Sequence, residues 1–422
     1  MIAAWIVAAA TLVMPAQAPD AAPEPEIVAS VQIHGNNATP DADVLAIAGV
    51  AAGDPFTPTL LADIRQRLLA SRRFEDVTVL KRYASIADPS RIALVILVDE
   101  RPVRVEAART PGGPPRVVRR GWLRNLMVLP ILSAEDGYGV TYGARLAYVD
   151  PIGRGSRLSF PLSWGGSKQA GAELERTFRK GPITRVQAGA SLDRTRNPAF
   201  EVDDSRRRTW MRAERAFGPL RVGGQVDWAR VSFDGTIDHL RSAGADVTVD
   251  TRVDPVLPRN AVFARASWTR TTIDGEAVDR RSVDARGYLG LVGQTVLVGR
   301  AAFDAASGPL PPYLQTLLGG WSSLRGYRAG AFVGETVASG SLELRVPLTS
   351  PLHVARTGVS VFVDAGAACR DGERIADRPA HVGVGAGVWA TATVLRFGVS
   401  VARGIGDGTR VNFEIGVLSS RF

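Results

Sequence analysis

Residue types that usually carry catalysis or metal binding are few in this chain and far apart. The single cysteine, Cys369, excludes an intramolecular disulfide and any zinc or iron–sulfur site built from cysteines. The four histidines have no metal-ligand spacing; they are His34, His239, His353 and His381. Nucleophile-elbow, zinc-protease and phosphate-loop motifs are absent. We therefore predict no enzymatic activity, no cofactor and no metal.

Charge is the more abundant chemistry. The chain has 51 Lys and Arg against 42 Asp and Glu, for a net charge of +9. The arginines are spread every few residues along strand-like segments, without the basic cluster and aromatic platform of a nucleic-acid-binding surface. This pattern excludes a nucleic-acid partner. It favours arginines that line a polar, partly basic interior of the folded chain. Contact with lipopolysaccharide phosphates would account for a second part of the positive charge.

The first residues resemble a secretory signal. Residues 1–18 contain an apolar stretch that ends in Ala16-Gln17-Ala18, a small-x-small cleavage pattern. The region before the apolar stretch has no Lys or Arg, so either the start lies further upstream or the signal is atypical. The alternative to a signal is a short membrane anchor, which needs a longer apolar run than this. Residues 19–26 are rich in Pro, Ala and acidic residues and predict a disordered tether.

Residues 27–103 predict a small α+β domain. The segment 27–34 alternates as a strand, 40–49 and 58–74 have helical spacing, and 76–83 and 92–99 alternate again. The order is β-α-α-β-β, with helices on one face of a small sheet. Residues 104–122 are rich in Pro, Gly and Arg and predict a linker.

Residues 123–422 predict a transmembrane β-barrel. Helical periodicity disappears, and alternating segments of about ten residues are separated by Gly, Pro, Asp and Asn. A mean hydropathy of +0.03 fits alternation between lipid and lumen. The segments number sixteen, at about 124–134, 139–149, 156–165, 170–179, 184–195, 206–217, 220–233, 239–251, 260–273, 279–290, 294–305, 335–348, 357–367, 381–391, 394–404 and 409–422. The fold class is thus mainly β: a 16-stranded antiparallel barrel after one small domain.

The N-terminal unit resembles a POTRA domain. The match rests on Gly35-Asn36 after the first strand, Gly53-Asp54-x-Phe56, and the step from Phe74 to Val77 between helix and strand. The resemblance implies that the domain binds client or partner segments by strand addition to a sheet edge. A generic α+β domain without a binding role is the alternative.

The connection 306–334 contains Leu324-Arg325-Gly326-Tyr327, similar to the (V/I/L)RG(F/Y) motif of the BamA/TamA superfamily and of two-partner-secretion transporters. The resemblance implies that this loop folds into the lumen and that Arg325 pairs with wall carboxylates, here Glu343 and Asp364. Alternation places Phe362 on the same face as Asp364, toward the lumen. The alternative is that Arg325 is a solvated loop residue.

The chain ends on Phe422, similar to the aromatic terminus that the barrel assembly machinery recognises when it inserts outer-membrane barrels. The family resemblance implies a Gram-negative outer-membrane location with the POTRA domain in the periplasm. It implies assembly or translocation of a client outer-membrane or secreted protein, with a periplasm-spanning partner possible. The alternatives are a two-partner-secretion transporter for one exoprotein and a passive channel or lipid-transport barrel.

Overall fold

The structure is a computed structural model that describes residues 25–36, 39–57, 59–84, 88, 90–100, 103–106, 116–119, 125–135, 137–153, 155–178, 180–349, 355–392 and 395–417. The predicted signal segment 1–18, most of the tether and Phe422 lie outside these residues.

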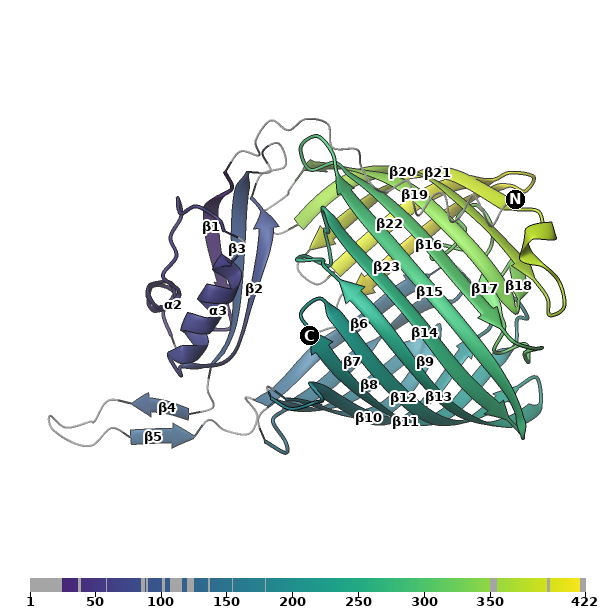
Figure 1. Cartoon of the computed structure of the whole chain (residues 1–422), viewed down its shortest axis with the longest axis horizontal. Helices are drawn as coiled ribbons and strands as arrows, with labels where there is room; N and C mark the ends of the chain where they lie inside the picture. Colours follow the sequence, from purple (N-terminus) through teal and green to yellow (C-terminus); the bar gives the residue numbers. More distant parts are fainter. Residues whose placement is uncertain are drawn as a thin grey trace, which may run out of the picture.

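The N-terminal domain is a three-stranded sheet covered by two helices. Its elements in chain order are β1 (Ile27–His34), α2 (Asp41–Ala48), α3 (Leu60–Ala70), β2 (Phe74–Tyr83) and β3 (Arg91–Glu100). The sheet order is β1-β3-β2, with β1 parallel and β2 antiparallel to the central β3. Both helices lie on the same face of the sheet (Figure 1). The predicted β-α-α-β-β order is confirmed.

Apolar side chains at helical and alternating spacing form the core of this domain. Ile64 and Leu68 lie one turn apart on α3 and are fully buried. Alternate residues of β3 face them, because successive side chains of a strand point to opposite sides. The cluster consists of Val28, Val44, Ala48, Val50, Ile64, Leu68, Phe74, Val77, Ile92, Leu94, Ile96 and Val98.

The predicted linker contains a feature that the sequence reading did not include. Strands β4 (Val103–Glu106) and β5 (Arg116–Arg119) pair antiparallel as a separate two-stranded sheet. Both segments are rich in valine, whose branched side chain favours extended backbone. The segment between them is rich in Pro and Gly, and this composition led to the prediction of a linker without strands.

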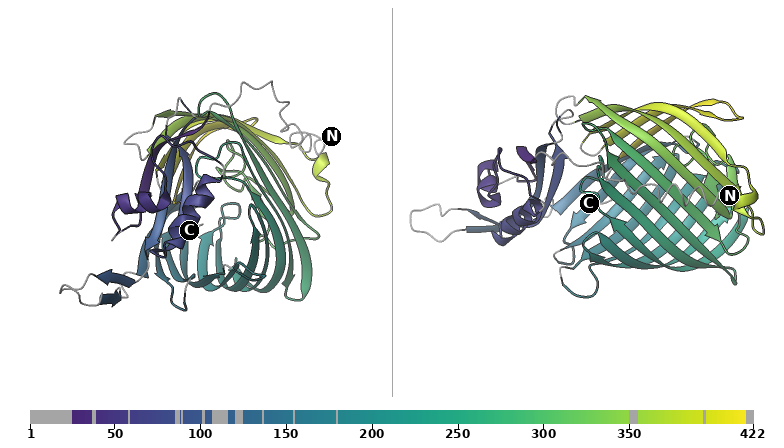
Figure 2. Two further views of the ribbon diagram at one scale, coloured as in Figure 1. Left: turned by 60° about the vertical axis from the view of Figure 1, so that its left-hand side comes forward. Right: turned by 45° about the horizontal axis from the view of Figure 1, so that its top comes forward.

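The rest of the chain forms a closed antiparallel barrel of 16 strands, as predicted (Figures 1 and 2). The strands are β6 (Leu126–Glu135), β7 (Gly139–Val149), β8 (Ser156–Gly165), β9 (Ser167–Thr177), β10 (Arg185–Arg196), β11 (Asp203–Phe217), β12 (Leu220–Phe233), β13 (Thr236–Asp250), β14 (Ala261–Ile273), β15 (Glu276–Gly290), β16 (Val296–Ala306), β19 (Thr336–Thr349), β20 (Ala355–Cys369), β21 (His381–Ala392), β22 (Leu395–Gly404) and β23 (Thr409–Val417). No helix among the described residues has the length and apolar character needed to cross a bilayer.

The two ends of the barrel differ. The N-terminal domain lies at one end, which we call proximal (Figure 1). The turns 150–155, 251–260 and 291–295 lie there, because the chain enters β6 from this side and every second connection returns to it. The other end, which we call distal, carries the connection 307–335 between β16 and β19.

Alternation decides which side chains face out. Tyr142, Trp164, Leu192 and Trp228 are exposed on the outer surface, whereas their chain neighbours point into the lumen. The outer wall is thus apolar over its middle and the lumen is polar, as a bilayer requires of a barrel.

Candidate functional site

The connection 307–335 folds back into the barrel. Within it, β17 (Thr316–Leu318) and β18 (Phe332–Gly334) form a small hairpin, and Leu318 and Leu324 are completely buried. These residues pack with Tyr327 against the wall strand β19. A long connection inside a wide barrel therefore has its own apolar core.

Arg325 is held by wall carboxylates on two neighbouring strands. Its Nε and Nη2 donate to the two oxygens of Asp364 at 2.8 Å each, and its backbone N–H donates to Asp364 at 3.0 Å. Its Nη1 donates to Glu343 Oε2 at 2.9 Å. The exposed fractions are 7% for Arg325, 1% for Asp364 and 9% for Glu343. A planar guanidinium matches this bidentate geometry, which a lysine could not reproduce.

The Phe362 ring covers one flat face of the Arg325 guanidinium. The Arg325 carbon Cζ lies 3.4 Å from the centroid of the Phe362 ring, a cation–π contact. Burial lowers the pKa of Arg325, but the hydrogen bonds and charges of Asp364 and Glu343 outweigh burial and raise it overall. The guanidinium is therefore charged at every physiological pH.

Strand register explains why these side chains meet. Glu343 is the direct ladder partner of Phe362, and Ser341 is the partner of Asp364, so all four point into the lumen from adjacent strands. Ser341 Oγ donates to Asp364 at 2.7 Å, and Arg345 Nε donates to Glu343 at 2.8 Å. Ser341 and Arg345 were not predicted from the sequence. Both alternate with Glu343 along the same strand and therefore lie on the same face.

Gly326 and Tyr327 fit the loop against the next strands of the wall, β21 and β22. Gly326 has φ +99° and approaches the backbone of Arg403 and Gly404 so closely that an added β-carbon would be 2.6 Å from the Gly404 nitrogen. The Tyr327 hydroxyl donates to the Ile405 carbonyl at 2.8 Å. The motif residues thus contact strands β19 to β22, and the structure brings all the predicted loop residues together.

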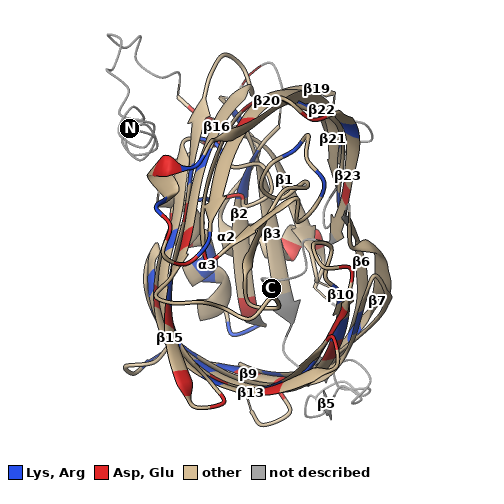
Figure 3. Cartoon of the chain, turned by 90° about the vertical axis from the view of Figure 1, so that its right-hand side faces the viewer, with Lys and Arg blue, Asp and Glu red and all other residues tan. Residues whose placement is uncertain are grey.

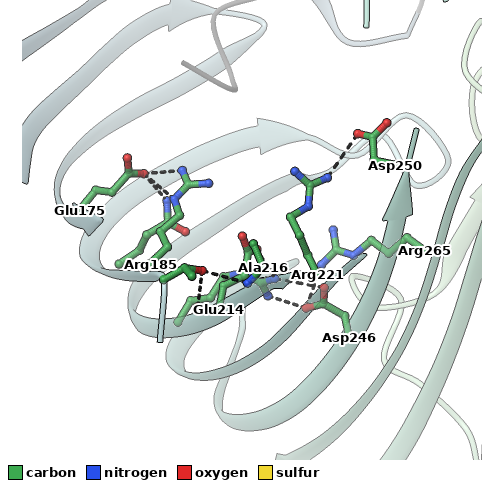
Figure 4. A network of polar contacts seen from close by, with 11 residues as sticks. Glu175, Arg185, Glu214, Ala216, Arg221, Asp246, Asp250 and Arg265 are labelled. Carbon is green, nitrogen blue, oxygen red and sulfur yellow. Dashed lines mark hydrogen bonds and ion pairs between the residues drawn. The ribbon is translucent and has the colours of Figure 1, made fainter. Parts of the chain in front are cut away.

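The inner wall beyond the loop is lined by ion pairs. Charged residues of both signs are interleaved around the barrel (Figure 3). Most of the pairs link neighbouring strands, two reach across an intervening strand and one lies within β15: Arg145–Glu173, Arg157–Glu175, Arg185–Glu175, Arg208–Asp227, Arg212–Asp246, Arg221–Asp250, Arg265–Asp246, Arg280–Asp304, Arg286–Asp284 and Arg300–Asp284. Figure 4 shows part of this network, with Asp246 between two guanidiniums. Many of the arginines spread along the strands are therefore lumenal and paired with carboxylates.

A polar cavity of about 350 Å³ lies between the loop and the proximal turn. Trp321, Arg325, Arg345, Arg396 and the turn segment 255–258 line it. The Trp321 ring packs directly over Gly398, where an added β-carbon would be 2.6 Å from the ring. The inserted loop and the turn thus narrow the lumen from both ends.

The junction between the first and last barrel strands is short. Among the described residues, β23 and β6 share the ladder pairs Glu414–Glu135, Ile415–Ala134 and Gly416–Ser133. In contrast, β6 and β7 remain in register from Leu126 to Glu135. Within the described part of the chain, this junction therefore has fewer ladder pairs than the other junctions between neighbouring barrel strands.

The POTRA-type motif residues have distinct structural roles. Gly35 has φ +92°, and an added β-carbon would be 2.0 Å from the Val98 carbonyl, so only glycine fits where β1 ends. Asn36 donates to the Asp41 carboxylate at 2.6 Å and thereby links the turn to the start of α2.

The remaining motif residues lie in the turn before α3 and in the core. Gly53 has φ +101° and donates its N–H to the Val28 carbonyl at 2.8 Å. The Lys81 ammonium lies 4.4 Å from the Phe56 ring centroid. Phe74 and Val77 are buried in the helix–sheet core.

The N-terminal domain contacts the proximal turn 251–260. Arg82 Nε lies 3.5 Å from Asp254 Oδ2, and the Arg259 guanidinium carbon lies 6.0 Å from the Tyr83 ring centroid. Asp254 also accepts the Val256 N–H at 2.9 Å. Burial raises the pKa of Tyr83 in spite of the opposing charge of Arg259. Sequence reading had not anticipated this contact.

Comparison with known proteins identifies the family. A model described as the Omp85 superfamily domain matches residues 139–420, and the POTRA model, described as surface antigen variable number repeat, matches residues 26–101. The fold is similar to BamA from Haemophilus ducreyi lacking POTRA domains 1–3, with a TM-score of 0.61, 14% identity, and coverage of 93% of this chain and 84% of that one.

A second similar structure is CdiB from Escherichia coli, with a TM-score of 0.52, 13% identity, and coverage of 96% of this chain and 92% of that one. No curated protein matches the sequence. A β-barrel of the matched family indicates the outer membrane of a Gram-negative cell. The predicted BamA/TamA-type resemblance is confirmed, since the first model covers well over half of the residues: the chain belongs to the Omp85 superfamily and carries one POTRA domain before its barrel.

Proposed function

We propose that this protein inserts or translocates client proteins at the outer membrane. The POTRA domain lies in the periplasm and gathers a client segment, and the barrel then opens between β6 and β23 to receive it. The observation that carries the proposal is that, among the described residues, β23 pairs with β6 at Ser133, Ala134 and Glu135 alone. The BamA and CdiB structures share this fold and favour an assembly or translocation role.

Two residues of these strands limit pairing. Gly416 of β23 stands in one of the junction pairs and has no side chain to pack across the ladder, and Pro130 of β6, which is paired with Ala144 of β7, has no N–H to donate. By contrast, the β22–β23 ladder runs from Leu395–Val417 to Arg403–Thr409. Over the residues that the structure describes, opening at the junction therefore breaks fewer ladder pairs than opening one strand earlier.

The free sheet edge of the POTRA domain lies along β2. The first residues of the β1 edge are already occupied, because Gly53 N–H donates to Val28 O and Val28 N–H donates to Asp54 O. On the β2 edge, Arg65 Nε satisfies the Val77 carbonyl at 2.9 Å with a half-exposed side chain that a client strand can displace. We assign client strand addition to β2.

The Arg325 cluster serves this function as an anchor. Holding the loop in the lumen keeps strands β19 to β22, which precede the junction, rigid, so that opening is confined to β6 and β23. Buried carboxylates on β19 and β20 balance the arginine, and removal of one partner would leave the other charge buried and unpaired. The same inserted loop argues against a passive channel, because it narrows the lumen.

A disulfide across the junction tests the proposal. In a Cys369→Ala background, Ala134→Cys with Ile415→Cys places two thiols at directly paired positions. The matched control, Phe397→Cys with Ile415→Cys, locks β22 to β23 and retains the same second cysteine. Client assembly in cells should fail only in the junction-locked protein and return on reduction. Normal assembly in the locked protein contradicts the proposal.

A two-partner-secretion transporter is the second candidate, supported by the similarity to CdiB over 96% of this chain. It moves one exoprotein through the lumen and does not require the junction to open. Two results together favour this candidate. The protein with the locked junction still secretes its exoprotein, and a protein whose inserted loop is tethered to the wall does not. Steady ion conductance by the wild-type protein in planar bilayers favours a passive channel instead.

A further inference from the structure

One side of the outer surface carries a row of cations near the distal end. They lie on strands β9 to β15, a few residues from the distal strand ends, and all are exposed. We call this set the basic belt: Lys168, Arg194, Arg196, Arg207, Arg230, Arg241, Arg270 and Arg281.

Ladder register shows that the belt faces outward. Arg207 is the direct partner of Leu192, and Arg241 is the partner of Trp228, two side chains that are about half exposed on the outer wall. Arg281 is likewise paired with the exposed Trp268. Directly paired residues lie on the same face of a sheet, so these arginines do not belong to the lumenal ion-pair network.

Part of the belt lacks a protein counter-charge. Arg194 binds Asp203 and Arg270 lies 3.9 Å from Asp279. In the portion of the chain that the structure describes, no ion pair or side-chain hydrogen bond involves Arg207, Arg230 or Arg241. These guanidiniums are available to an external anion.

Their arrangement favours such an anion. Arg207 is directly opposite Arg230, which in turn is directly opposite His239, on three adjacent strands. Directly opposed like charges destabilise a sheet by an amount similar to the gain from an opposite pair. A bound phosphate between two arginines reverses the sign of this interaction, because a guanidinium binds phosphate oxygens in a bidentate manner.

The surface just below the belt is apolar. Toward the proximal end, the outward positions on the same strands are aromatic or aliphatic, including Trp228, Trp268, Met211 and Val226. An aromatic girdle of this kind marks the boundary of the bilayer core. A ligand that uses both zones has phosphate groups at the level of the arginines and hydrocarbon chains below them.

Outward cations near the distal end are concentrated on one side of the barrel, with Arg403 on β22 as the exception among the described strands β16 to β23. On strands β16, β19, β20 and β21, the outward positions carry no charged side chain over the whole strand; on β19 these are Thr336, Ala338, Gly340, Leu342, Leu344, Val346 and Leu348. A general need for a polar rim would place cations on all sides. The asymmetry indicates a site.

We propose that the basic belt binds a phosphorylated glycolipid of the outer leaflet, with its phosphates between the arginines of β11 to β15 and its acyl chains on the apolar wall below. The site is independent of the client and of the β6–β23 junction, so this proposal and the proposed function can fail separately. Lipid bound here fixes the depth of β9 to β15 in the bilayer, on the side away from the apolar face of β19 and β20.

Binding of purified full-length protein to bis-phosphorylated lipid A tests the proposal. Native mass spectrometry in detergent measures the bound lipid. Binding is compared with that of dephosphorylated lipid A, and inorganic phosphate is added as a competitor. The test variant combines Arg207→Gln, Arg230→Gln, Arg241→Gln and Arg281→Gln. The control combines Arg176→Gln and Arg215→Gln, two outward arginines at the proximal end that stack on Phe178 and Phe217.

We expect the test variant to bind bis-phosphorylated lipid A about tenfold or more weakly, with the control unchanged and binding reduced by salt. Equal binding of the dephosphorylated lipid, equal loss in the control, or full competition by millimolar inorganic phosphate each overturns the proposal. As a second measurement, Arg207→Gln alone should leave unfolding in lipid-free detergent unchanged or raise its midpoint, and should reduce the stabilisation produced by lipid A. A lower midpoint without lipid contradicts the idea that these arginines repel each other.

Discussion

Gly383 on β21 lies directly beneath the Arg325 backbone: an added β-carbon would be 1.9 Å from the Arg325 carbonyl oxygen. The loop therefore rests on the wall at a point where no side chain fits. The closeness of this approach aligns the guanidinium with Asp364 on the neighbouring strand.

Gly383→Ala should displace the loop, because the methyl group and the Arg325 carbonyl cannot share the space. We expect faster protease cleavage within 320–328. We also expect the folded barrel, which migrates as a compact band in SDS gels of unheated samples, to unfold at a lower temperature. Gly340→Ala is the control, since its added β-carbon would meet no atom closer than 3.6 Å. Equal behaviour of the two variants would mean that the loop tolerates a shift at Gly383.

Much of this architecture was predictable from alternation. Asp364 and Phe362 point into the lumen because alternate residues of a strand share one face. Each predicted barrel strand overlaps an observed one along most of its length, as in 139–149 and 220–233. Periodicity of two is a strong signal when one face meets lipid and the other meets polar groups. This is why a sequence without long apolar runs still predicted a barrel.

The wall glycines were less predictable. Gly383, Gly385 and Gly387 recur at alternate positions, a spacing that marks one strand face as open to close approach. The residue that approaches Gly383 is Arg325, about sixty positions earlier in the chain, and local pattern cannot supply such a contact. The β4–β5 hairpin and the Arg82–Asp254 contact were missed for the same reason, since both depend on pairing between segments.

Asp364→Asn should be more damaging than Glu343→Gln. Asp364 accepts three bonds from Arg325, including the backbone N–H, whereas Glu343 accepts one and is also paired with Arg345. Breaking a buried pair by removing one charge costs roughly 3–5 kcal/mol. Urea unfolding in liposomes, followed by tryptophan fluorescence, measures the difference.

Arg325→Lys provides the accompanying control, because it retains the positive charge and loses the bidentate geometry. We expect a stability between those of the wild type and Asp364→Asn. If Arg325→Lys equals the wild type, charge alone holds the loop and the geometric argument is wrong.

Arg82→Glu should release the POTRA domain from the proximal turn, since it places a carboxylate beside the nearly buried Asp254. Distances between spin labels on α3 and on a strand of the barrel should become longer and broader. Arg73→Glu is the control, because Arg73 pairs with Asp43 within the domain on an exposed surface. An unchanged distance distribution in Arg82→Glu would show that other contacts hold the domain.

Acid should loosen the base of the inserted loop through Glu335, at the end of β18. Burial raises the pKa of this carboxyl, but hydrogen bonds from Gln315, Leu310 and Asp371 outweigh burial and lower it below the usual 4.5. A carboxyl with a lowered folded pKa stabilises the fold fully above its unfolded pKa, and the contribution is lost as pH falls through the folded value.

The difference in unfolding temperature between the wild type and Glu335→Gln should therefore be constant from pH 7 to about 5.5 and shrink as pH falls below 4.5. Glu276→Gln, at an exposed position at the start of β15, corrects for the general effect of removing one acid. A difference that stays the same down to pH 3 would mean that the Glu335 charge does not stabilise the loop. In that case the hydrogen bonds of an uncharged side chain at this position would be sufficient to hold β18 next to β20.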